Sequence, residues 1–444
     1  MNPTQPLYLD NRRRFLEILE RENACAVIPT GSHRTRNHDC DYRFRPHSDF
    51  WWLTGFSEPD ATLVLLPQGE QRVILFMNER DKLAEIWDGR RVGTERAPGL
   101  LKVDAAYPNS ELWERLPELM KGAEQIVYRD GEDEDRDRAF ANTLKKMREA
   151  VRRGVPAPLR VVDTTLWLHE LRLRKSPAEL DLMRRAAAVT AEAHTEAMRQ
   201  ASPGMNECEI DALLDYTFRR RGGTGAAYNN IVAGGANACI LHYVENDMPL
   251  GDGDLLLIDA GCEMDNYASD VTRTFPVNGK FTDEQRAIYE IVLDAEKLAV
   301  AAVKPGVTSV QLHEIARRRL VEGMVALGLI EGTVDEIIEN GTYDRFFMHK
   351  TGHWLGIDVH DQGRYFDADG GSRPLEPGMV LTVEPGFYIA EDDESVEPRW
   401  RGIGVRVEDD ILVTEDGHEN LTAAIPKEVA DVEAMCQARE LAPA

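Results

Sequence analysis

Two acidic residues, Asp259 and Asp270, lie on the two arms of a predicted β-hairpin. LLLIDAG is a short apolar strand, YASDVTRTF is a second strand rich in β-branched and aromatic residues, and polar residues join them. A turn centred on Met264 and Asp265 would make the two acids directly opposed, with Cβ atoms roughly 4.5 to 5.5 Å apart and their like charges destabilising. One or two divalent cations would remove that repulsion, since carboxylates are ligands of hard cations. A solvated surface hairpin explains the pair equally well at this point.

Later segments carry the other side chains that a site for two metal ions needs. FMHKTGHWLGIDVHD holds His349, His353 and His360, in a chain that has only 11 histidines. Glu384 ends the apolar strand of VLTVEPGFY, where it is either solvated or aimed into a site. His242, in ILHYVEN, closes a predicted strand that could border the same cleft.

In GIGVRVEDD, strand alternation places Arg406 and Glu408 on one face, where one can orient or balance the other. The predicted ligands are Asp259, Asp270, His353, Glu384 and Glu408. Four carboxylates with one imidazole suit two oxygen-loving divalent ions better than they suit a thiolate zinc site. We expect Mn²⁺ first, with Co²⁺ and Zn²⁺ as alternatives.

Composition limits the class of protein. The 52 basic and 78 acidic side chains give a formal charge of -26, which repels nucleic acid and anionic membranes and attracts cations. The N-terminal segment lacks the apolar core of a signal peptide, and no apolar run has the length of a membrane span. The six cysteines are scattered without CxxC spacing. These features predict a cytoplasmic protein with free thiols.

Two domains are predicted to position these residues. Residues 1–174 combine helices with the strand candidates CAVIP, ATLVLLP and QRVILFM, as an α/β domain does. Ser176 and Glu179 form a capping box that opens a long helix, and Thr282 and Thr308 mark two further helix starts. Strand candidates lie between and after these helices. Residues 175–444 are therefore predicted to be an α+β domain with a mostly antiparallel sheet.

The segments DAGCEMDNYASDVTRTFP, TGHWLGIDVHD, VLTVEPGFY and GVRVEDD resemble the five-ligand signature of the pita-bread metallopeptidases, which include aminopeptidase P, prolidase and methionine aminopeptidase. In the first domain, YRFRPHSDFWWLTGFSEPDATLVLLP and EIWDGRRVG resemble the N-terminal region of aminopeptidase P. The resemblance implies a creatinase-N-like domain over 1–174 and a catalytic pita-bread domain with a curved sheet over 175–444. It also implies a homo-oligomer, a dimer or a tetramer, in which Trp87 and Asp39 lie at the rim of a neighbouring subunit's active site.

By the same resemblance, Asp270 and Glu408 bridge two metal ions, Asp259 completes one site, and His353 and Glu384 complete the other. The implied activity is hydrolysis of the N-terminal Xaa-Pro bond of peptides by a metal-bridging hydroxide. That bond is a tertiary amide without an N–H, so proteases that hold this N–H fail on it.

Roles for the remaining side chains follow as hypotheses. Glu384 would carry the proton to the departing proline nitrogen, and His360 would donate to the developing oxyanion. His242 and His349 would shape the proline pocket, with Arg406 also on the substrate side.

Two other functions remain as alternatives: a prolidase limited to Xaa-Pro dipeptides, and a non-catalytic module that binds peptide or protein.

Several residues are interpreted as structural. His313 and His418 are predicted to be core or surface residues, and NNIVAGGANA is interpreted as a sheet turn rather than a phosphate loop. Trp51 and Trp52 are assigned to domain packing. A polar loop, rather than a metal site, is predicted for His33, His38, Cys40 and His47.

Overall fold

The computed structural model describes residues 5–438 of the 444-residue chain. The chain forms two compact units, Met1–Arg172 and Leu173–Ala444. Within residues 5–438, every helix is too short or too polar to cross a lipid bilayer. Each unit has its own hydrophobic core.

The first unit is built on a mixed six-stranded sheet in the order β6-β5-β4-β1-β7-β8. These strands are β1 (Ala24–Pro29), β4 (Thr62–Leu65), β5 (Val73–Met77), β6 (Ala105–Pro108), β7 (Gln125–Val127) and β8 (Arg160–Val162). The predicted strand runs CAVIP, ATLVLLP and QRVILFM become β1, β4 and β5, which pair antiparallel in that order. The short exposed strands β2 (Thr35–Asn37) and β3 (Cys40–Asp41) form a separate pair.

Helices complete the first unit, and the longest of them are amphipathic. In α6 (Glu134–Ala150), Asp133 caps the N-terminus by accepting from the Arg136 N–H, and Phe140 and Leu144 are buried. The others are α1 (Gln5–Arg21), α2 (Ser48–Thr54), α3 (Ala84–Asp88), α4 (Ala97–Leu101), α5 (Leu112–Leu119) and α7 (Leu168–Leu173). The mixture of parallel strands and helices confirms the predicted α/β character of this region.

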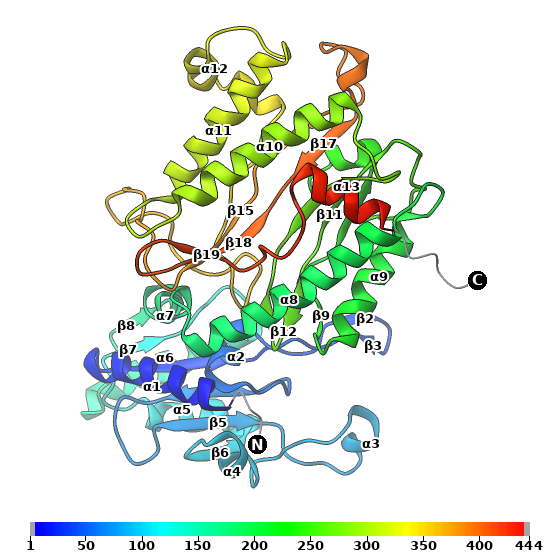
Figure 1. The fold of residues 1–444 in the computed structure, drawn as a ribbon. Coiled ribbons are helices and arrows are strands. Elements are labelled where there is room, and N and C mark those ends of the chain that lie inside the picture. The colour runs from blue at the N-terminus through cyan, green and yellow to red at the C-terminus, as the bar shows by residue number, and fades with distance from the viewer. Residues whose placement is uncertain (1–4, 439–444) are drawn as a thin grey trace. The chain divides into compact units, whose positions relative to one another are not determined.

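The helices of the second unit begin where the capping residues predicted. Capping boxes at Ser176, Thr282 and Thr308 open α8 (Pro177–Gln200), α10 (Asp283–Ala302) and α11 (Ser309–Ala326). The remaining helices are α9 (Glu207–Arg220), α12 (Val334–Asn340) and α13 (Val429–Gln437). In Figure 1, α8, α10 and α13 form a layer over the strands β11, β15, β17 and β18. The α8–α9 and α10–α11 pairs pack side by side.

All strand ladders of the second unit are antiparallel, as predicted. One sheet joins β10 (Ile231–Gly234), β11 (Leu255–Asp259) and β14 (Thr272–Pro276), and another joins β15 (Val380–Val383), β18 (Asp409–Val413) and β19 (His418–Asn420). Shorter ladders join β16 (Gly386–Ile389) to β17 (Ile403–Arg406), and β9 (Gly225–Ala226) to β12 (Cys262–Met264) and β13 (Tyr267–Ala268).

The central hairpin corrects one detail of the sequence prediction. Its turn is centred on Asp265 and Asn266, one residue later than predicted, and both have positive φ values of 49° and 66°. Asp and Asn tolerate this left-handed conformation in a two-residue hairpin turn, and Met264 does so poorly. The resulting register pairs Asp259 with Thr272, so the prediction that Asp259 directly opposes Asp270 is wrong. Asp270 is instead a diagonal neighbour of Asp259, two residues before Thr272.

Candidate metal centre and active site

The five predicted ligands meet in one cavity of about 910 Å³ within the second unit. Asp259 ends β11, Asp270 lies just before β14, Glu384 directly follows β15, and Glu408 lies between β17 and β18. His353 lies on the loop that runs beside β15. Four segments that are distant in sequence therefore supply one cluster.

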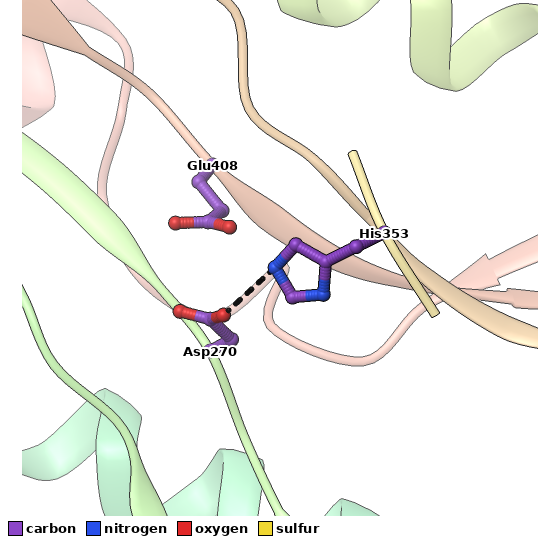
Figure 2. A group of neighbouring side chains, drawn as sticks. All are labelled: Asp270, His353 and Glu408. Carbon is purple, nitrogen blue, oxygen red and sulfur yellow. Dashed lines mark ion pairs between the residues drawn. The ribbon is translucent and has the colours of Figure 1, made fainter. Parts of the chain in front are cut away.

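Donor atoms of Asp270, His353 and Glu408 all lie within 4.8 Å of one another. Figure 2 shows their two carboxylates and the imidazole facing a common space. His353 Nε2 is 3.3 Å from Asp270 Oδ2 and 3.6 Å from Glu384 Oε1. Asp259 joins the cluster through Tyr228, whose hydroxyl hydrogen-bonds Asp259 Oδ1 at 2.6 Å and also contacts Asp270 Oδ1.

Close backbone packing places Asp270 and His353. A Cβ atom at Gly261 would lie 1.7 Å from the Ser269 carbonyl oxygen, and one at Gly352 would lie 2.0 Å from the Thr382 oxygen. Glycine is therefore required at both contacts. Hydrogen bonds join the loop carrying His353 to β15 and its end. The Thr382 and Glu384 N–H groups donate to the His353 and Thr351 carbonyl oxygens, and the His353 N–H donates to Thr382 Oγ1.

Buried polar groups behind the cavity wall hold the acidic side chains that are the predicted ligands. Asp410 accepts from the Asp270 N–H at 3.2 Å and from the Ser269 hydroxyl at 2.8 Å. Thr272 Oγ1 donates to Glu408 Oε2 at 2.7 Å. Because these partners are themselves buried, each fixes the orientation of a ligand that water could otherwise solvate.

Burial and the neighbouring negative charges raise the pKa values of three of these four carboxyl groups. Burial, followed by the charges of Asp270 and Glu384, raises the pKa of Glu408 well above its usual range. Burial and Asp270 outweigh His353 and raise the pKa of Glu384 to about 7, and burial also raises the pKa of Asp259. Although burial opposes it, hydrogen bonding to His353 lowers the pKa of Asp270.

Few cationic groups offset this acidic charge. Arg406 Nη2 pairs with Asp259 Oδ2 at 2.7 Å. Against the effect of burial, the hydrogen bond to Asp270 and the charge of Glu384 raise the pKa of His353 to about 9. Four crowded carboxylates and one imidazole are the donor set that divalent cations take, and a cation would replace the protons these groups retain. The residues present therefore fit a site for divalent metal ions.

Three further predicted histidines line the same cavity, as does Arg406. His349 Nε2 lies 2.9 Å from the Tyr388 hydroxyl, and its Nδ1 lies 3.9 Å from Glu384 Oε2. Burial and then the charge of Arg406 lower the pKa of His349 to about 4, so its ring is neutral at pH 7. His360 packs edge-on against His353 with ring centres 4.2 Å apart. His242 is exposed at the cavity wall and lies in a turn, so the prediction that it closes a strand is wrong.

The remaining predicted residues lie elsewhere. Trp87 is on α3 of the first unit with 87% of its surface exposed, and Asp39 is exposed in the same unit. The histidines and Cys40 of the first-unit loop form no ligand cluster within residues 5–438, and His47 instead caps α2. His418 is bound to the Val303 carbonyl oxygen at 2.9 Å, in agreement with its structural interpretation.

Sequence reasoning missed residues that the fold brings to the cavity. Tyr228 precedes β10, and the β10–β11 register, with Ile231 opposite Asp259, carries it to the ligands. NNIVAGGANA, interpreted as a sheet turn, contains strand β10, which its apolar run IVA could have indicated. The pairing of β10 with β11, which brings Tyr228 to the cavity, has no local signal in the sequence. His313 was interpreted as a core or surface residue, yet it lines the cavity with Nδ1 2.8 Å from Thr351 Oγ1.

Comparison with known proteins decides the family. The model described as "Metallopeptidase family M24" matches residues 181–415, and the model "Aminopeptidase P, N-terminal domain" matches residues 8–128. The chain belongs to metallopeptidase family M24. This membership confirms the predicted resemblance to aminopeptidase P, and the M24 chain is accordingly a metallopeptidase.

Sequence similarity to the relatives of this protein extends over almost the whole length of the chain. It is 45% identical to the Xaa-Pro aminopeptidase of Escherichia coli (strain K12), with 96% of each chain covered. It is 35% identical to human Xaa-Pro aminopeptidase 3, covering 98% of this chain and 86% of the relative.

Solved structures agree with this assignment. Pseudomonas aeruginosa aminopeptidase PepP superimposes with a TM-score of 0.94 at 46% identity, covering 98% of each chain. A zinc-substituted E. coli aminopeptidase P in complex with product gives a TM-score of 0.93 at 44% identity, covering 98% of this chain and 99% of the other. The predicted architecture, an N-terminal α/β domain followed by a pita-bread domain, is confirmed.

Proposed function

We propose that this protein removes the N-terminal residue from peptides whose second residue is proline, by hydrolysing the Xaa-Pro bond. The observation that carries the proposal is the meeting of Asp259, Asp270, His353, Glu384 and Glu408 on the wall of one cavity. Relatives at 45% and 44% identity named Xaa-Pro aminopeptidase support the same substrate class.

The proposed cofactor is a pair of divalent ions, with Mn²⁺ favoured because oxygen ligands dominate. Asp270 and Glu408 would bridge the pair, Asp259 would complete one site, and His353 and Glu384 would complete the other. Donor atoms of Asp270, His353 and Glu408 lie close enough together to share one ion, which supports assigning these three residues to the same metal site. When bound, the ions supply a water-derived nucleophile at neutral pH and polarise the scissile carbonyl.

The side chains around the ligands would handle protons and substrate. Glu384, with a pKa near neutrality in the metal-free cavity, is suited to accept a proton and deliver it to the departing proline nitrogen. His360, beside His353, would donate to the developing oxyanion. His349, held neutral and hydrogen-bonded to Tyr388, would form the proline pocket together with His242.

A strict dipeptidase, or prolidase, is the less favoured alternative. The cavity of about 910 Å³ continues past the ligand cluster to residues of α11, which leaves room for a chain beyond proline. The acidic ligands offer charge complementarity to the free amino end of a peptide. Both features favour an aminopeptidase acting on peptides longer than two residues. A non-catalytic module is disfavoured because all five proposed ligands are present.

The proposed assembly is a homo-oligomer, a dimer or a tetramer. Three large apolar side chains of the first unit, Leu83, Ile86 and Trp87, are 74%, 73% and 87% exposed around α3. Exposed apolar groups of this kind favour contact with another protein surface. This supports the proposed role of Trp87 at the rim of a neighbouring subunit's active site, and the same rim role is proposed for Asp39.

The six free cysteines support a reducing, cytoplasmic location. The proposed domains are residues 1–174 and 175–444.

Replacing Glu384 with Gln tests the mechanism. The variant keeps the shape of the side chain but cannot carry a proton, so kcat on Ala-Pro-Ala should fall by about 100-fold or more. Bound metal is measured in parallel by mass spectrometry, and Glu394→Gln, at an exposed position, is the matched control. Near-normal turnover of Glu384→Gln with full metal content would refute the assigned role.

A further inference from the structure

Two cationic side chains line the cavity without a carboxylate partner among the described residues 5–438. Helix α11 carries three consecutive arginines, of which Arg318 pairs with Asp335 at 2.8 Å and Arg319 pairs with Asp294 at 2.9 Å. Arg317 lines the cavity, and within residues 5–438 it forms no ion pair. Lys350, exposed on the same wall, likewise has no ion-pair partner in the part of the chain that is described.

Arg317 is held in place by aromatic contact. Its Nη1 donates to the Tyr343 hydroxyl at 3.3 Å, and its guanidinium carbon lies 5.6 Å from the centre of the Tyr343 ring. Its Nε is buried and has no hydrogen-bond partner. Nη2 forms no hydrogen bond within residues 5–438, so the Nη1–Nη2 end of this guanidinium is the part suited to bind a carboxylate.

The local charge on this wall is positive in a strongly acidic chain. Among the charged side chains that line the cavity on this wall, Arg317, Lys350 and Glu314 sum to +1, against -26 for the whole chain. Asp344 acts on His313 but does not line the cavity. Burial, followed by the positive charges of Lys350 and Arg317, lowers the pKa of His313 to about 4, with Asp344 opposing them. His313 is therefore neutral at pH 7 and adds no charge of its own.

A short series of contacts joins this wall to the proposed catalytic residues. The Glu384 N–H donates to the Thr351 carbonyl oxygen at 2.8 Å, and Thr351 Oγ1 lies 2.8 Å from His313 Nδ1. Arg317 follows His313 by four residues on α11, which places their side chains on the same helix face. The Phe347 ring lies between His313 and His349, with centres 5.6 and 4.9 Å away.

The cavity thus has an acidic ligand cluster and a separate cationic wall. A peptide bound with its amino end at the acidic cluster would extend past proline towards the positively charged wall that carries Arg317 and Lys350. Thr351 contacts both Glu384 of the cluster and His313 of this wall, so the wall adjoins the cluster on the side that residues after proline would occupy.

We propose that Arg317 and Lys350 form a carboxylate subsite that binds a negative charge of the substrate on the C-terminal side of proline. This carboxylate is either the chain terminus of a short peptide or the side chain of an acidic residue after proline. The inference rests on the proposed function, because it takes the peptide direction from that reaction. It goes further in assigning a charge preference to the substrate.

The test compares four peptides with the full-length protein supplied with Mn²⁺. Ala-Pro-Ala against Ala-Pro-Ala-amide isolates the terminal carboxylate, and Ala-Pro-Asp-amide against Ala-Pro-Asn-amide isolates a side-chain carboxylate. The anionic member of at least one pair should have a kcat/KM about tenfold higher, equivalent to about 1.4 kcal/mol. The pair that discriminates identifies the source of the carboxylate.

The double variant Arg317→Gln/Lys350→Gln should abolish this ratio while the neutral peptides are cleaved as by the wild type. Arg317→Lys should retain part of it, and Arg318→Gln, which removes a paired arginine on the same helix, should leave it unchanged. Equal cleavage within both wild-type pairs, or equal losses on charged and neutral peptides in the double variant, would refute the subsite alone. Absence of cleavage of all four peptides would refute the proposed function together with the subsite.

Discussion

Arg273 is the buried residue whose removal most directly tests how the fold supports the site. It lies on β14, is fully buried, and pairs with Asp409 at 2.6 Å. Its guanidinium also donates to the backbone oxygens of Glu408 at 2.5 Å and Thr272 at 2.9 Å. One side chain therefore joins the strand after Asp270 to the strand segment that carries Glu408.

The magnitude for Arg273→Met follows from these contacts. Removing one partner of a buried ion pair costs about 3 to 5 kcal/mol. Lys427, whose Nζ lies 2.5 Å from Asp409, still neutralises that carboxylate, which places the cost nearer the lower value. At about 2 to 4 °C per kcal/mol for a domain of this size, a cost of about 3 kcal/mol should lower Tm by about 6 to 12 °C.

The assay is differential scanning calorimetry of the metal-free protein, accompanied by titration with Mn²⁺. Arg273→Met should also bind the metal more weakly, because the Glu408 backbone loses its anchor. Arg286→Met, which removes an exposed ion pair with Glu290 on a helix surface, is the control and should melt close to the wild type. A Tm for Arg273→Met within about 2 °C of the wild type would refute the reasoning.

Two further predictions concern the ligands themselves. The pKa of His353 is raised from 6.5 to about 9 by Asp270 and Glu384 against burial, and that of Glu384 is raised from 4.5 to about 7, chiefly by burial. Each folded-state pKa lies above its unfolded value, so the metal-free protein should lose stability as pH rises from about 4.5 to 9. Metal should restore more stability at pH 9 than at pH 6, and an equal increase in Tm at both pH values would count against the ligand assignment. Gly261→Ala should weaken metal binding at least tenfold, because the new Cβ would collide with the Ser269 carbonyl oxygen. Gly99→Ala, with open space around the new Cβ, is the control. Unchanged metal affinity in Gly261→Ala would contradict the packing argument.

The sequence predicted elements whose signals are local. Capping boxes at Ser176, Thr282 and Thr308 gave the starts of three helices, because a cap and its partner are only three residues apart. Apolar runs likewise gave the principal strands of the first unit. The candidate ligands could be proposed because acids at the ends of apolar strands need a physical explanation.

Long-range register was the part that the sequence left open. The hairpin turn differs by one residue from the prediction, and that single step replaces a directly opposed Asp259–Asp270 pair by a diagonal one. Tyr228 and His313 were missed because their roles depend on which strand or loop packs beside them. No short-range pattern in the sequence specifies those neighbours.

Product analysis by mass spectrometry tests the central claim most directly. The Mn²⁺-loaded protein is given Ala-Pro, Ala-Pro-Ala and Ala-Ala-Pro, with a chelator-treated sample as the control. We predict release of alanine and Pro-Ala from Ala-Pro-Ala, no cleavage of Ala-Ala-Pro, and loss of activity on metal removal. Cleavage of Ala-Pro alone, or release of alanine from Ala-Ala-Pro, would contradict a metal-dependent aminopeptidase specific for the N-terminal Xaa-Pro bond.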